Sequence, residues 1–159
     1  MALRNIIEEG DPVLRKVCRE VGEVSDRYKE MLDDMVDTMR EANGVGLAAP
    51  QVGIMRRMFV AEPEPDELYY FVDPEIVELE GEQESNEGCL SVPGKIGTVI
   101  RPEKIRITGK NKEGEMQDLT FEGFAATVMC HEFDHLEGIL YIDKADNIRS
   151  ADEAYEEEE

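Results

Sequence analysis

Residues 123–136 place the strongest constraint on how this chain can fold. The segment predicts a helix whose apolar side chains point in nearly all directions around its axis: Phe124, Ala125, Ala126, Val128, Met129, Phe133 and Leu136. A helix that is apolar on every side is a buried helix. Burying charged groups without partners is costly, so the ionisable residues on this helix are informative about function.

The predicted helix carries the pattern H-E-x-x-H at His131, Glu132 and His135. Residues four apart lie one above the other on a helix, so both imidazoles face one point and can share one metal ion. Glu132 is rotated by about 100° from His131, which suits a general base better than a third ligand. The alternative interpretation is a pair of hydrogen-bonded histidines in an apolar core.

A catalytic metal site also needs a third protein ligand and an open coordination position. One familiar extension of the pattern adds a glycine and then a third histidine. This chain follows it through Gly138 but has Tyr141 at the position of that histidine, and it contains two histidines in all. The third ligand must therefore be another residue type.

Three cysteines are the next candidates. Cys130 adjoins His131, and adjacent helix positions do not face each other, so its thiol should point away from the metal. Cys18 is adequately explained as a small buried hydrophobic residue. Cys89 lies within the glycine-containing segment 86–94, where the backbone can approach closely. Spacing favours Cys89 as the ligand but leaves the question open.

The rest of the chain predicts an α+β fold with small antiparallel β-sheets packed around a central buried helix that carries H-E-x-x-H. A second helix should follow the N-cap Ser25 and end at Asn43-Gly44, with one apolar stripe along its length. Short strand-like segments are separated by Pro, Gly and acidic turns, as in antiparallel sheets. These segments are 57–61, 68–72, 76–79, 104–108 and 119–121.

Length and charge limit the organisation of the protein. A chain of 159 residues with 41% hydrophobic residues can form one core, which we assign to a single catalytic domain at 1–148, followed by an acidic tail at 149–159. A net charge of −21 argues against direct nucleic-acid binding and favours a well-solvated monomer. The apolar runs are too short to span a membrane, and charge interrupts the N-terminus too early for a secretory signal. We therefore expect a cytoplasmic protein.

Three segments resemble the motifs of the peptide deformylases, in the order in which that family has them. They are 44–51 (GVGLAAPQ), 87–91 (EGCLS) and 131–135 (HEFDH), and the likeness extends from 11–15 to 141–143. The family commonly has Gln before its first metal histidine, where this chain has Cys130. Some bacterial members end in a basic helix that docks on the ribosome, whereas this chain ends in acidic residues. The resemblance thus allows transient ribosome proximity without such a helix.

The resemblance implies a role for each matching residue. Cys89, His131 and His135 would bind the metal, and Glu132 would act as base and then as acid. The Gln51 side chain and the Leu90 backbone N–H would stabilise the oxyanion. Gly46 would align the substrate peptide through its backbone, and Val45, Phe124 and Val128 would line the methionine pocket.

The implied reaction removes the formyl group from the N-terminal methionine of newly made polypeptides, with N-formylmethionyl nascent peptides as partners and release of formate. Family members generally work best with one Fe²⁺ ion, for which Ni²⁺ or Co²⁺ can substitute, and Zn²⁺ often gives a poorer enzyme. Two other hypotheses fit the sequence. One is a zinc endopeptidase that cleaves unformylated peptides, and the other is a structural metal site without enzymatic activity.

Overall fold

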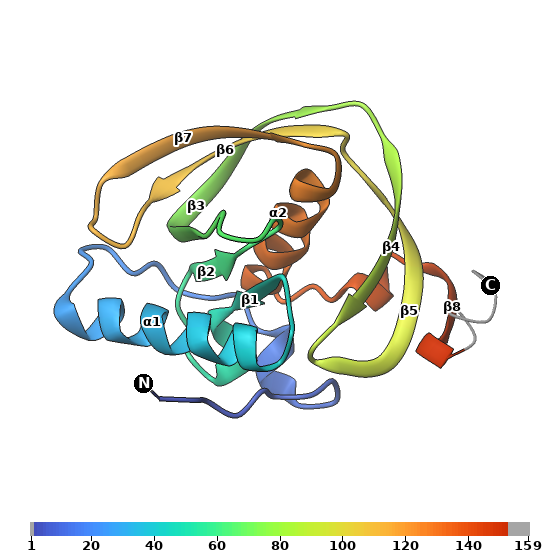
Figure 1. Ribbon diagram of the computed structural model, residues 1–159, viewed down its shortest axis with the longest axis horizontal. Coiled ribbons are helices and arrows are strands. Elements are labelled where there is room, and N and C mark those ends of the chain that lie inside the picture. Colours follow the sequence, from blue (N-terminus) through green and yellow to red (C-terminus); the bar gives the residue numbers. More distant parts are fainter. Residues whose placement is uncertain (1, 153–159) are drawn as a thin grey trace.

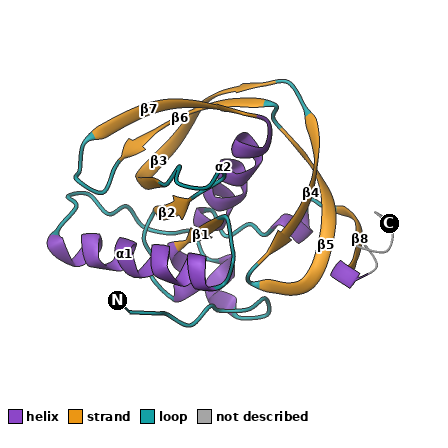
Figure 2. Ribbon diagram, in the orientation of Figure 1, coloured by secondary structure: helices purple, strands orange, loops and turns teal. Residues whose placement is uncertain are grey.

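The computed structural model describes residues 2–152 and contains two α-helices and two antiparallel sheets within that range (Figures 1 and 2). The helices are α1 (Asp26–Glu41) and α2 (Gly123–Leu136). The strands are β1 (Gly46–Ala48), β2 (Met58–Ala61), β3 (Tyr69–Glu80), β4 (Gln83–Cys89), β5 (Val92–Arg101), β6 (Lys104–Lys110), β7 (Met116–Glu122) and β8 (Asp146–Ser150). Short 3₁₀ helices cover Pro12–Arg15, Ala49–Val52 and Tyr141–Asp143. The predicted α+β class is confirmed.

The larger sheet has the order β1-β2-β3-β6-β7 and is covered on both faces near β2. Alternate residues of β2 point to opposite faces, as in any strand. Met58 and Val60 pack in one apolar cluster with the buried stripe of α1, and Phe59 and Ala61 pack in another with α2. Each helix therefore buries apolar side chains against the same strand from opposite sides.

The helix α1 begins where the sequence predicts. The Ser25 side chain accepts a hydrogen bond from the backbone N–H of Tyr28, which satisfies one of the donors left free at a helix start. The apolar stripe is buried at Leu32, Met35, Val36 and Met39. This helix supports the sheet and contributes no side chain to the predicted site.

The smaller sheet, with the order β4-β5-β8, is absent from the sequence prediction. Its strand β4 has the sequence QESNEGC, which lacks the β-branched and aromatic residues typical of strands. Backbone pairing with β5 stabilises it instead. In Figure 1 this sheet lies on the opposite side of α2 from the larger one, and α2 contacts strands of both.

Two further segments differ from the sequence prediction. The predicted strands 68–72 and 76–79 are one long strand, β3, which continues through a bulge at Asp73, a residue with a positive φ of 50°. The strand β8 pairs with β5 through Arg149 and Ser150, two residues that the charge pattern assigns to the acidic tail. The remainder of that tail from residue 153 onward lies outside the described residues.

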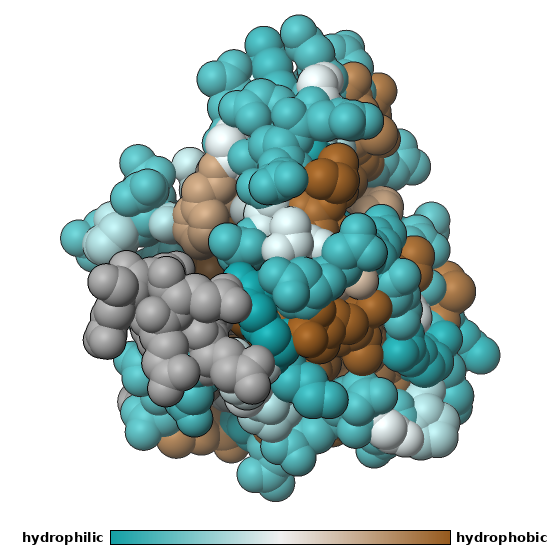
Figure 3. Space-filling view, turned by 90° about the vertical axis from the view of Figure 1, so that its right-hand side faces the viewer, coloured by the Kyte–Doolittle hydropathy of each residue, from teal (hydrophilic) through white to brown (hydrophobic). Residues whose placement is uncertain are grey.

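Hydrophilic residues predominate on the face drawn in Figure 3 and surround smaller apolar areas. Within residues 2–152, no helix is long and apolar enough to cross a membrane.

Candidate metal centre and active site

Three side chains from two elements converge beside α2. Cys89 lies at the end of β4, and His131 and His135 lie one turn apart on α2. One ligand atom from each lies within 4.8 Å of the other two, and the Cys89 Sγ is 3.4 Å from the His135 Nε2. The two imidazole centroids are 5.1 Å apart. A thiolate and two imidazoles at these separations fit one divalent transition metal.

Glu87 fixes the orientation of His131 through the ring nitrogen that does not face the cluster. The His131 Nδ1 lies 2.9 Å from the Glu87 Oε1, which leaves the Nε2 to face the cluster. Ligand histidines in metal proteins commonly have this kind of carboxylate partner on the second ring nitrogen. The ring of Tyr141 stacks on His131 with centroids 5.8 Å apart and limits its rotation further. Tyr141 thus stands where a third histidine would be in the extended motif, but it supports a ligand.

Glu87 is itself held by a buried arginine. Arg101 donates to both carboxylate oxygens of Glu87, at 2.8 and 2.7 Å, and to Asp134 at 2.7 Å. Burial alone would raise the pKa of Glu87, but hydrogen bonds from Arg101 and His131 outweigh it and lower this pKa to about 2. Glu87 therefore stays ionised and keeps its hydrogen bond to the imidazole.

The two histidines have different electrostatic surroundings. Burial, together with the charges of His131 and Arg101, lowers the pKa of His135 well below its ordinary value and favours the neutral form that binds metals. Burial also disfavours charge on His131, but Glu132, Cys89 and Glu87 together raise its pKa above the ordinary value. The same negative surroundings favour a metal cation at the His131 Nε2.

Glu132 lies beside the cluster without belonging to it. Its side chain is buried, and its Oε1 has no hydrogen-bond partner among residues 2–152. Burial raises the pKa of Glu132 to about 7, while the charge of His131 opposes that rise. A carboxyl group with a pKa near neutrality and a free oxygen can both accept and return a proton.

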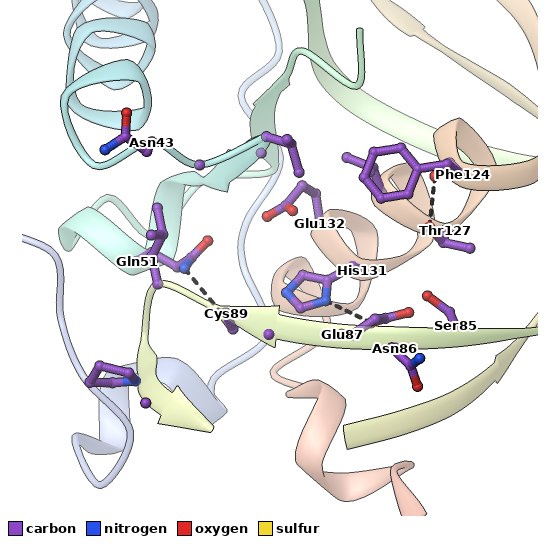
Figure 4. Close-up of a pocket in the computed structure, with 18 residues that line it drawn as sticks. Asn43, Gln51, Ser85, Asn86, Glu87, Cys89, Phe124, Thr127, His131 and Glu132 are labelled. Carbon is purple, nitrogen blue, oxygen red and sulfur yellow. Dashed lines mark hydrogen bonds and ion pairs between the residues drawn. The ribbon is translucent and has the colours of Figure 1, made fainter. Parts of the chain in front are cut away.

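Gln51 presents its amide nitrogen to the same space from the 3₁₀ helix Ala49–Val52. Its Oε1 accepts a hydrogen bond from the Ala48 backbone N–H at 2.9 Å, which fixes the orientation of the amide. Its Nε2 then donates to the Ser91 Oγ at 2.9 Å and lies 3.5 Å from the Cys89 Sγ (Figure 4). Leu90, whose backbone N–H is the other predicted oxyanion donor, lines the same cavity.

The cluster opens into a cavity of about 430 Å³ between β1, β4 and α2 (Figure 4). All four residues predicted to contact substrate, Val45, Gly46, Phe124 and Val128, line it together with Glu132 and His131. Val45 and Phe124 are exposed and Val128 is buried. The cavity therefore combines apolar side chains with two of the candidate ligands, Cys89 and His131.

Sequence reasoning did not find several residues that support this site. Glu87 is inside a recognised motif, yet nothing in the pattern indicates its contact with His131. Arg101, Asp134 and Ser91 are distant from the residues that they orient and give no signal of their own. A buried arginine is recognisable only once its carboxylate partners are placed around it.

A thiol and two imidazoles with a buried carboxylate beside them, next to a cavity of about 430 Å³, are the features of a metal-dependent hydrolase. A sequence model of the family described as polypeptide deformylase matches residues 3–151. A peptide deformylase of Agathobacter rectalis is 49% identical over 146 residues, which is 92% of each chain. One of Acetivibrio thermocellus is 50% identical over 153 residues, covering 96% of this chain and 88% of that protein.

Solved structures show the same fold. The crystal structure of peptide deformylase from Thermotoga maritima aligns with a TM-score of 0.89 and 39% identity, covering 92% of this chain and 99% of that one. A peptide deformylase from Legionella pneumophila aligns with a TM-score of 0.88 and 40% identity, covering 92% and 88%. The chain belongs to the polypeptide deformylase family, whose activity is the removal of N-formyl groups from nascent peptides.

Proposed function

We propose that residues 1–148 form a single deformylase domain in which Cys89, His131 and His135 bind one Fe²⁺ ion and Glu132 is the general base. The observation that carries this proposal is the convergence of the three ligand atoms within 4.8 Å of one another. In this proposal α2 is the central catalytic helix, because it holds two ligands and the base. Residues 149–159, predicted as an acidic tail, contribute nothing to the catalytic machinery in this proposal, although Arg149 and Ser150 belong to β8.

The family resemblance favours Fe²⁺, and the donor set is compatible with that ion. A site with one thiolate and two imidazoles accepts several divalent ions, so Ni²⁺, Co²⁺ or Zn²⁺ can replace Fe²⁺. When bound, the ion supplies Lewis acidity, which activates water at neutral pH and polarises the formyl carbonyl. Glu87 and Tyr141 hold the ring of His131 in one orientation, which favours tight metal binding.

Glu132 moves the proton that the reaction requires. Its unpartnered Oε1 can accept a proton from the attacking water and later deliver it to the leaving amine of methionine. The pKa of about 7 suits both steps. An amine is a poor leaving group unless it is protonated. In this proposal the same carboxyl group removes the proton from water and then transfers it to the amine.

Gln51 and Leu90 stabilise the negative charge that develops on the formyl oxygen. Ala48 fixes the amide of Gln51 before substrate arrives, so little reorganisation is needed during the reaction. The backbone N–H of Leu90 is the second donor. Removing one such donor typically lowers turnover by about 10²–10³-fold.

The substrate is the formylated N-terminus of a nascent peptide. We infer that it adds as an extended segment along β1, where Gly46 offers its backbone, because β1 is an edge strand of the larger sheet within residues 2–152. The methionine side chain enters the cavity next to Val45, Phe124 and Val128. A formyl group removes the terminal positive charge, so no carboxylate is needed to bind it. We further propose that the protein acts as a cytoplasmic monomer close to the ribosome.

One assay tests this function. The protein is purified without oxygen, loaded with Fe²⁺ or Ni²⁺, and supplied with formyl-Met-Ala-Ser, and formate release is measured. Deformylation supports the proposal. Cleavage of internal bonds in unformylated peptides would point to an endopeptidase, and tightly bound metal without any hydrolysis would point to a structural site.

A further inference from the structure

Two residues with hydroxyl side chains line the catalytic cavity from different elements. Ser85 on β4 and Thr127 on α2 both line it, although their residues are only 8% and 4% exposed overall. No feature of the proposed mechanism uses either one. Thr127 lies on α2 between Phe124 and Val128, two of the side chains expected around the methionine of the substrate.

The backbone geometry places Ser85 two strand residues, and Thr127 about one helical turn, from residues of the reacting centre. Glu87 contacts His131. Ser85 is two residues before Glu87 on the same face of β4, a distance of about 7 Å along the strand. Thr127 is four residues before His131 on the same side of α2, about 6 Å along the helix. In Figure 4 Ser85 lies on β4 and Thr127 on α2, so the two side chains reach the cavity from different elements.

A methionine side chain is long enough to reach from the reacting centre to the level of Ser85 and Thr127. Four bonds of about 1.5–1.8 Å carry a methionine side chain roughly 5 Å beyond its Cα. The reacting carbonyl must lie beside His131 and Glu132. A side chain that runs from there past Val128 would bring its sulfur and terminal methyl group to the level of Ser85 and Thr127. These hydroxyls are therefore the polar groups that the end of the side chain meets.

Ser85 is available to donate a hydrogen bond. Its hydroxyl has no hydrogen-bond partner among residues 2–152, and Figure 4 shows its oxygen directed towards α2. The Thr127 hydroxyl already donates to the Phe124 backbone carbonyl at 2.6 Å. The two groups differ in this respect, and Ser85 is the one with an unused proton.

We propose that Ser85 makes this deformylase accept substrates whose first side chain ends in a hydrogen-bond acceptor, in particular formyl-methionine sulfoxide peptides. This inference rests on the proposed function. Oxidation turns the thioether into a polar group with a strongly accepting oxygen. An apolar pocket would bury that oxygen without a partner, which is unfavourable. The Ser85 hydroxyl offsets the loss by donating to it, and Thr127 keeps the opposite wall polar.

Three peptides of equal length test the proposal. They are formyl-norleucine-Ala-Ser, formyl-Met-Ala-Ser and formyl-methionine sulfoxide-Ala-Ser, which place a methylene, a thioether or a sulfoxide at the same position. We expect the wild-type Ni²⁺ enzyme to hydrolyse the sulfoxide peptide with a kcat/KM within about tenfold of that for norleucine. A discrimination of more than a hundredfold against the sulfoxide would overturn the inference, while hydrolysis of the other two peptides would leave the proposed function intact.

Variants then test whether the Ser85 hydroxyl is responsible for hydrolysis of the sulfoxide peptide. In Ser85→Ala, the sulfoxide-to-norleucine ratio of kcat/KM should fall about tenfold, since a neutral hydrogen bond contributes about that factor. Thr127→Val should lower the ratio by a smaller factor, because its proton is already shared with Phe124. Thr120→Val, on the exposed face of β7, is the matched control and should leave the ratio unchanged. An unchanged ratio in Ser85→Ala, with melting temperature and metal content as in wild type, would refute the role of Ser85.

Discussion

Gly46 approaches the carboxylate of Glu132 so closely that a methyl group on its Cα would lie 2.4 Å from the Glu132 Oε2 and 2.8 Å from the carboxyl carbon. Real Cβ atoms do not come that near to other atoms. The glycine of the first motif therefore makes room for the proposed base as well as offering its backbone to substrate. These two residues are 86 positions apart in the sequence, and only the packing of β1 against α2 brings them together.

Gly46→Ala should displace Glu132 without unfolding the protein, because a side chain can shift where a backbone cannot. A displacement of about 1 Å in a catalytic group typically lowers turnover by about 10²-fold. Formate release under saturating substrate measures this, with metal content and melting temperature measured alongside. Wild-type turnover in this variant would mean that the carboxylate need not occupy its observed position.

Glu132→Ala should bind metal as tightly as the wild type but lose about 10²–10⁴-fold in turnover, because it removes the proton carrier and no proposed ligand. Metal content by elemental analysis and formate release by coupled assay separate the two effects. Full activity in this variant would exclude Glu132 as the base.

Cys89→Ala should lose metal affinity, since it removes the one thiolate of the proposed ligand set. Competition with a chromogenic chelator measures the change. Cys18→Ala is a suitable control, because Cys18 is also a buried thiol but lies in the apolar cluster of the larger sheet. Equal metal affinity in Cys89→Ala and wild type would remove Cys89 from the ligand set.

The ion pair of Glu87 and Arg101 should make stability depend on acidity. The pKa of Glu87 is lowered to about 2 in the folded protein, against about 4.3 in an unfolded chain. A depressed carboxyl pKa adds stability that is fully present above the unfolded value and is lost as the pH falls towards the folded one. The contribution at neutral pH is about 3 kcal/mol by the usual conversion.

Urea unfolding of the metal-free protein between pH 6 and pH 3 measures this dependence. Glu87→Gln cannot titrate at that position, so its free energy of unfolding should fall less steeply over the range than that of wild type. Glu84→Gln, exposed on the same strand, is the control and should follow wild type. Parallel slopes for Glu87→Gln and wild type would contradict the assignment.

Gly138→Ala should destabilise the fold by roughly 2–4 kcal/mol, combining a left-handed backbone with a steric clash. Gly138 has a φ of +75°, and a Cβ there would lie 2.5 Å from the Arg15 carbonyl oxygen. Gly22 has a similar φ of +77° but no atom within 4 Å of such a Cβ, so Gly22→Ala should cost only the backbone component. Thermal unfolding of the two variants tests the comparison, and equal losses would show that the contact with Arg15 is unimportant.

Much of the larger sheet and both helices could be predicted from sequence because their signals are local. Ser25 caps α1, its apolar stripe has helical spacing, and 104–108 and 119–121 are apolar in alternation. The smaller sheet could not be predicted in this way. Its strand β4 is polar and glycine-containing and depends on pairing with β5, which is information held in another part of the chain.

The residues of the candidate site also divide into those predictable from local sequence and those that depend on tertiary contacts. The spacing of His131 and His135 on one helix is enough to predict that they face one point, and the structure places them so. Spacing alone did not decide which cysteine is the third metal ligand, and the family resemblance indicated Cys89. The supporting contacts of Glu87, Arg101 and Tyr141 were not predictable, because each depends on which surfaces meet in three dimensions. The catalytic and binding roles of the named residues remain predictions.

The position of α2 between the two sheets has a consequence for how the protein responds to losing its metal. Cys89 approaches the cluster from the smaller sheet, while His131 and His135 are carried by a helix packed on the larger one. An ion held by all three would therefore cross-link the smaller sheet to α2. Loss of the ion would weaken the contact between these elements at the cavity that substrate enters. Oxidative damage at that thiolate would then weaken the architecture and the chemistry in a single event.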